Sequence, residues 1–164
     1  MTAHSRLAAR LWVHDLELPA PIVLPPDVKL SFPWVRISGS KAYISGHGPL
    51  NTDGSIARPL GKVGKDLSLE EGYDAARLTA LAMLASLKVA LGDLDRVDSW
   101  LRVFGMVNTD PSFNPYPRVI NGFSDLIAEV YGGERGSHAR SAIGVAGLPF
   151  DIPVEIEAEV LIRP

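Results

Sequence analysis

The segment from Ser68 to Gly92 constrains the fold more than any other part of this sequence. It opens with Ser68-Leu-Glu-Glu71, a capping box in which the serine and glutamate side chains satisfy backbone amides at a helix start. Apolar residues then recur at helical spacing until Gly92, a residue that commonly ends helices. The many alanines of this segment suit close packing. The sequence therefore predicts a long helix that lies against a β-sheet.

Strand patterns flank this helix on both sides. Residues 35–38 and 41–45, separated by Gly39-Ser40, predict a two-residue hairpin, and the apolar run 100–107 predicts a buried central strand. A second helix is expected over 118–131, ended by Gly132-Gly133. Residues 58–67 are expected to form a loop or a short strand, and residues 5–16 a short helix. Five prolines between 19 and 33 predict an extended arm.

Two C-terminal segments, 138–145 and 154–158, alternate polar and apolar residues, as strands do. The turn-rich residues 147–151 lie between them, so we expect these two strands to form a hairpin. With 164 residues, the chain has the length of one domain. Two helices and five or six strands predict an α/β (α+β) domain with one mixed sheet and both helices on one face. The other face then needs cover, which self-association would supply.

Composition excludes several classes of function. The net charge is −3 and the 16 basic residues are scattered, which argues against a nucleic-acid partner. The absence of cysteine rules out thiol chemistry, and the histidines lack metal-ligand spacing. No apolar stretch is long enough to span a membrane, and the N-terminus does not resemble an export signal. A soluble cytoplasmic protein is expected.

Arg140 and Glu155 are the most informative charged residues, because each lies in one of the two C-terminal strand patterns. A guanidinium binds a carboxylate through two parallel hydrogen bonds, and a nearby carboxylate can exchange a proton. The pair is therefore a candidate site for a small organic acid. The alternative is a structural ion pair between Arg140 and Glu155 or Glu157.

Several motifs, taken in order, resemble the Rid superfamily, also called YjgF-like and labelled endoribonuclease L-PSP. They are Ser45-Gly46-His47-Gly48-Pro49, Gly61-Lys62-Val63-Gly64, Leu91-Gly92, Asp95-Arg96-Val97, Ala139-Arg140-Ser141, Leu148-Pro149 and Val154-Glu155-Ile156-Glu157-Ala158. The resemblance covers residues 32–162. It divides the chain into an N-terminal helix and proline-rich arm, 1–31, and a Rid-like domain, 32–164.

The resemblance implies a chorismate-mutase-like fold and a homotrimer around a central barrel, with ligand clefts between subunits. Related proteins hydrolyse 2-imino acids to 2-oxo acids and ammonia without a metal or an organic cofactor. By this resemblance Arg140 binds the substrate carboxylate and Glu155 positions or activates water. Gly46 and Ala142 shape the pocket, and Asn121 lines the cleft.

Three positions depart from the family pattern. His47 replaces a glutamine, Trp34 replaces a pocket tyrosine, and Ser124 stands where a tyrosine follows the family asparagine. His47 is interpreted either as a general base or as a turn residue bonded to the backbone. His138 shares a strand face with Arg140. It is interpreted as an interface residue or as a residue that supports Arg140 in binding a carboxylate.

These departures leave three hypotheses open. The first is an imine or enamine deaminase that uses Arg140 and Glu155. The second is a small-carboxylate-binding protein without catalysis, and the third is an endoribonuclease, against which the acidic composition argues.

Overall fold

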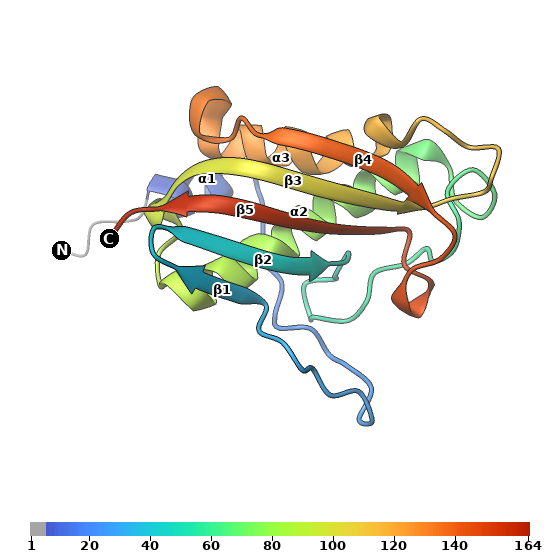
Figure 1. The fold of residues 1–164 in the computed structure, drawn as a ribbon, viewed down its shortest axis with the longest axis horizontal. Helices are drawn as coiled ribbons and strands as arrows, with labels where there is room; N and C mark the ends of the chain where they lie inside the picture. Colours follow the sequence, from blue (N-terminus) through green and yellow to red (C-terminus); the bar gives the residue numbers. More distant parts are fainter. Residues whose placement is uncertain (1–5) are drawn as a thin grey trace.

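The computed structural model describes residues 6–164, which form three α-helices, two short 3₁₀ helices and five strands (Figure 1). In chain order these are α1 (Arg6–Val13), β1 (Val35–Ser38), β2 (Lys41–His47), α2 (Leu69–Leu91), η1 (Leu94–Arg96), β3 (Val97–Asn108), α3 (Tyr116–Arg135), β4 (Ala139–Val145), η2 (Pro149–Asp151) and β5 (Val154–Ile162). The predicted mixed α+β architecture is confirmed. Within residues 58–67, Val63 makes only isolated bridges and no strand forms.

The five strands form one sheet in the order β1-β2-β5-β3-β4. β3 and β4 are parallel, because α3 connects them as a crossover, and the other neighbours are antiparallel. The predicted hairpin of residues 138–145 with 154–158 is therefore wrong. β3 lies between β4 and β5 and pairs with both of them, so the two C-terminal strands do not touch.

Helices α2 and α3 cover one face of the sheet (Figure 1). The capping box forms as predicted, with Ser68 Oγ accepting from the Glu71 amide and Glu71 accepting from the Ser68 amide. The two helices approach closely at Gly122, where a Cβ would lie 2.0 Å from the carbonyl oxygen of Tyr73. Arg77 and Glu129 join the helices through two hydrogen bonds of 2.9 and 3.0 Å.

The opposite face of the sheet is open within the described chain. Side chains at 154, 156 and 158 of β5 are buried under the helices, so Glu155 and Glu157 point to the open face. Two large apolar side chains of this face, Tyr43 and Ile143, are 42% and 40% exposed. Apolar surface of this kind is typical of an association surface.

The N-terminal arm, which we define as residues 17–33, has no helix or strand, as predicted. Backbone hydrogen bonds of 2.9 Å from Ala20 to Thr52 and from Val23 to Gly54 fasten it to a turn. Gly54 has a φ of 85°, and a Cβ there would lie 2.2 Å from the carbonyl oxygen of Pro21. Only glycine therefore suits this position. The division of the chain at residue 31 stays a prediction.

None of the helices in the described residues 6–164 is long and apolar enough to cross a membrane.

Candidate functional site

The structure distributes the predicted site residues over three places. One group lies where the edge strand β4 meets α3, a second lies on the open face of β2 and β5, and a third lines a cavity under the N-terminal arm. The first group is Arg140, Asn121 and Ala142. The second group is Gly46 and Glu155, and the third is Trp34 and His47.

Arg140 is held at the β4–α3 edge by neutral acceptors only. Its Nη1 donates to Asn121 Oδ1 at 2.9 Å and to Ser124 Oγ at 3.0 Å, and Nη2 donates to the carbonyl oxygen of Pro117 at 3.3 Å. Within residues 6–164 it forms no ion pair. Partial burial lowers the pKa of the Arg140 guanidinium. The alternative of a structural ion pair with Glu155 or Glu157 is therefore wrong, and the charge of Arg140 is available to an anion.

A serine and a histidine support this arginine from behind. His138 Nδ1 is 2.7 Å from the Gly136 carbonyl oxygen and must donate to it, so Nε2 accepts from the Ser124 hydroxyl at 2.9 Å. Ser124 Oγ is then free to accept from Arg140. Burial, and to a smaller extent Arg140 itself, lowers the pKa of His138 and keeps the ring neutral. His138 therefore supports Arg140 through the hydroxyl group of Ser124.

Glu155 lies on the open face next to Gly46 of β2. A Cβ at position 46 would lie 2.2 Å from Glu155 Oε1, so the glycine leaves the space that the carboxylate fills. Burial raises the pKa of Glu155, and the neighbouring Glu157 raises it further. A carboxylate with a raised pKa binds a proton more readily than an ordinary carboxylate does, which suits a group that takes and returns protons.

Arg140 and Glu155 are far apart in one chain. Arg140 is paired with Val103 and Glu155 with Met106, on opposite sides of β3. Two strand spacings and three residue rises separate their Cα atoms by roughly 14 Å. Arg140 reaches the helical layer, whereas Glu155 points to the open face. A single chain cannot bring both groups to one small molecule.

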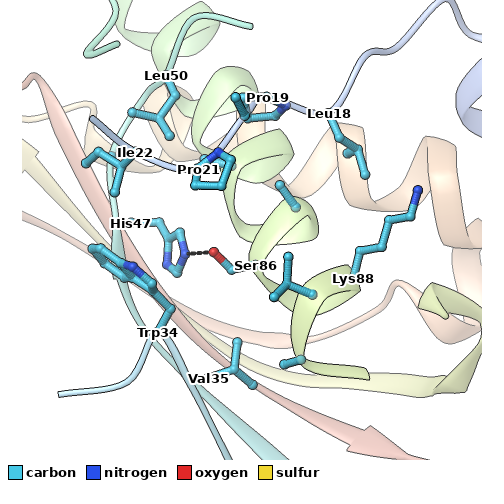
Figure 2. A pocket seen from close by; sticks show the side chains of 16 residues that line it. Leu18, Pro19, Pro21, Ile22, Trp34, Val35, His47, Leu50, Ser86 and Lys88 are labelled. Atoms are coloured by element: carbon cyan, nitrogen blue, oxygen red, sulfur yellow. Dashed lines mark hydrogen bonds between the residues drawn. The ribbon is translucent and has the colours of Figure 1, made fainter. Parts of the chain in front are cut away.

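His47 and Trp34 line a cavity of about 530 Å³ (Figure 2). Their rings lie 4.9 Å apart between centroids. His47 Nδ1 is 2.6 Å from the Ser45 carbonyl oxygen, and Nε2 is 2.8 Å from Ser86 Oγ. Burial lowers the pKa of His47 to about 4, so the ring is neutral at neutral pH. His47 is bonded to the backbone, which was the second interpretation of this residue.

A β-bulge explains why His47 faces the cavity. Ile44 is paired with Ala158 and His47 with Ile156, so β2 has one more residue than β5 over this interval. Strict alternation would have sent His47 to the open face. The extra residue turns it to the helix-covered side instead.

The sequence reasoning missed Ser86 and Lys88, which line the same cavity. A signal was present in α2. The alanines of this helix predict close packing, but those at 82, 85 and 90 line a cavity that no side chain of residues 6–164 fills.

Comparison with known proteins identifies the family. Residues 9–154 match the model described as "YjgF/chorismate mutase-like, putative endoribonuclease". The chain therefore belongs to the YjgF/chorismate mutase-like family, as the sequence motifs predicted.

Individual relatives cover nearly the whole chain. Protein TCP17 of Trypanosoma cruzi is 41% identical over 160 residues, which are 98% of this chain and 96% of TCP17. The structure of Atu1372 from Agrobacterium tumefaciens, a protein of unknown function, is 38% identical with a TM-score of 0.85, covering 96% of this chain and 93% of that one. A "putative endoribonuclease" from Shewanella oneidensis MR-1 is 29% identical with a TM-score of 0.84, covering 97% of this chain and 100% of that one.

No metal site is evident in the part of the chain that the structure describes, because residues 6–164 contain no group of three or more histidine, aspartate or glutamate side chains placed to hold an ion.

Proposed function

We propose that this protein hydrolyses small 2-imino acids to 2-oxo acids and ammonia, at a site that two copies of the chain build together. The observation that carries this proposal is the environment of Arg140. Three hydrogen bonds to neutral acceptors fix the direction of the guanidinium, and no carboxylate of residues 6–164 forms an ion pair with it, although the nearby Asp125 carboxylate acts to raise its pKa. Such a group is suited to bind the carboxylate of a small acid.

Glu155 supplies the second function of the proposed site. Its pKa is raised by burial, and its carboxylate occupies the space that the missing side chain of Gly46 leaves. As a carboxylate it takes a proton from a water molecule while the water oxygen attacks the imine carbon. The carboxyl group then returns the proton to the nitrogen. The product of this addition is a carbinolamine. Its hydroxyl group gives its proton to Glu155, which passes it to the amino nitrogen as the C–N bond breaks, so ammonia leaves and the carbon keeps the oxygen as a carbonyl group.

The distance between Arg140 and Glu155 requires a second copy. They point to opposite sides of one sheet, so the arginine of one chain must meet the glutamate of its neighbour. The half-exposed apolar residues of the open face supply a surface on which copies could associate. We propose the homotrimer around a central barrel as the assembly that brings the two edges together, with Asn121 and Ala142 lining one wall and Gly46 the other.

The test is a hydrolysis assay with 2-aminoacrylate generated in situ, followed through pyruvate and ammonia release. The proposal predicts acceleration over buffer that is lost in Arg140→Gln and kept in Arg58→Gln, an exposed arginine that serves as the control. Wild-type protein that gives no acceleration with several 2-imino acids would reject the proposal.

A carboxylate-binding protein without catalysis is the second candidate, because Trp34 and His47 contribute to a separate apolar cavity rather than to the Arg140 site. It predicts that 2-oxo acids raise the melting temperature of the wild type but not of Arg140→Gln, without turnover. Measurable turnover would exclude it.

A further inference from the structure

The cavity that contains His47 lies apart from the proposed catalytic groups and has a different chemical character. It is enclosed by the N-terminal arm, the start of β1, the end of β2 and the C-terminal half of α2 (Figure 2). Its volume of about 530 Å³ is within the range of pockets that hold small organic molecules.

The arm makes the roof of this cavity rigid. Pro19 and Pro21 fix the backbone, and hydrogen bonds from Ala20 and Val23 attach it to the 52–54 turn. The arm is therefore held over the cavity by its own backbone contacts, and an incoming molecule does not have to order it.

The lining is apolar except for three side chains. His47 and Ser86 satisfy each other through their 2.8 Å hydrogen bond. Lys88 is exposed and forms no ion pair within residues 6–164. Figure 2 shows its side chain running from α2 toward Leu18 of the arm. No aspartate or glutamate lines the cavity.

We infer that this cavity binds an organic anion with an apolar body, which lies against Trp34 and the α2 alanines while its charged group pairs with Lys88. The argument is one of charge complementarity. A neutral apolar molecule would contact the apolar lining but would leave the Lys88 ammonium group without an anionic partner. A small polar acid could pair with Lys88 but would leave the apolar lining in contact with water.

Two fluorescent probes with the same apolar body test this inference. 8-Anilinonaphthalene-1-sulfonate carries a negative charge, and N-phenyl-1-naphthylamine lacks it. The wild type is expected to bind the sulfonate more tightly. Lys88→Met is expected to weaken the sulfonate about fivefold and to leave the neutral probe within about twofold, because only the charged contact is lost. Lys65→Met, an exposed lysine outside the cavity, is expected to change neither.

A second variant tests where the probes bind. Ala85→Leu puts bulk into the cavity wall and is expected to weaken both probes at least about fivefold. Ala90→Leu, at the exposed rim, gives an independent obstruction if Ala85→Leu does not fold, as judged by circular dichroism. Arg140→Gln is expected to leave both affinities unchanged. Equal sulfonate affinity in wild type and Lys88→Met, or loss of binding in Arg140→Gln, would overturn the inference without touching the proposed catalysis.

Discussion

The end of β2 and the start of β4 contain the same small arrangement of atoms in different settings. In each, a histidine donates from Nδ1 to the carbonyl oxygen two residues earlier and accepts at Nε2 from a serine of the overlying helix. The pairs are His47 with Ser86 of α2 and His138 with Ser124 of α3. At β2 the serine has no further side-chain hydrogen bond within residues 6–164, whereas at β4 it also accepts from Arg140.

This difference shows that the function of a neutral histidine–serine pair depends on the groups around it. Beside the apolar cavity the pair satisfies polar atoms in a buried wall. Beside Arg140 it fixes the direction of a charged group at the surface. Substitutions in the His47–Ser86 pair should therefore change the free energy of unfolding. Substitutions in the His138–Ser124 pair should change the binding and turnover of acid substrates.

The largest expected effect separates Arg140 from His47. Arg140→Gln should lower kcat/KM for 2-imino acids about 100- to 1,000-fold, because the charge that holds the substrate carboxylate is gone. His47→Gln should leave kcat/KM within about threefold, because His47 lies in the cavity wall. Steady-state kinetics of both variants check this. A comparable loss in His47→Gln would show that the two regions are not separate.

Acid should destabilise the protein mainly through the β2 histidine. The unfolded chain binds a proton at His47 near pH 6.5, whereas the folded chain binds it only near pH 4. Stability therefore falls as pH decreases through this window, and the contribution of His47 approaches about 3 kcal/mol. Denaturant unfolding at several pH values should show a smaller loss in His47→Gln than in the wild type or in the exposed control His14→Gln. Identical pH dependence in all three would contradict burial of a neutral His47.

The smallest effects concern the two serines. Ser124→Ala should raise KM about fivefold with little change in kcat, because Arg140 loses one of its acceptors. Ser86→Ala should lower the free energy of unfolding by about 1 kcal/mol and leave kinetics unchanged. Steady-state kinetics and unfolding curves of both variants check this. A raised KM in Ser86→Ala with no change in Ser124→Ala would contradict the assignment.

The sequence was sufficient for the local structure. Ser68 with Glu71, and Gly92, identify the ends of α2 because capping is a local interaction. Gly39-Ser40 identifies the β1–β2 turn for the same reason. The sequence also identifies Arg140 and Glu155 as candidate site residues.

Long-range pairing and side-chain direction were not accessible in this way. Alternation at 138–145 and 154–158 is the same whether the strands pair with each other or each pairs with β3, so the wrong hairpin was predicted. The bulge before His47 also has no recognisable signal in the sequence, although it determines on which face of the sheet the imidazole ring lies. The cavity arises from the arm, α2 and β2 together, and no single segment encodes it.

The central claim is that Arg140 of one chain acts with Glu155 of another, and mixing two inactive variants tests it directly. Arg140→Gln and Glu155→Gln are each expected to be inactive alone. In a ring assembled at random from equal amounts of both, one interface in about four has an intact arginine facing an intact glutamate, so roughly a quarter of wild-type activity should return. Mixed assemblies, verified by mass spectrometry, that show no activity above that of the separate variants would contradict the claim.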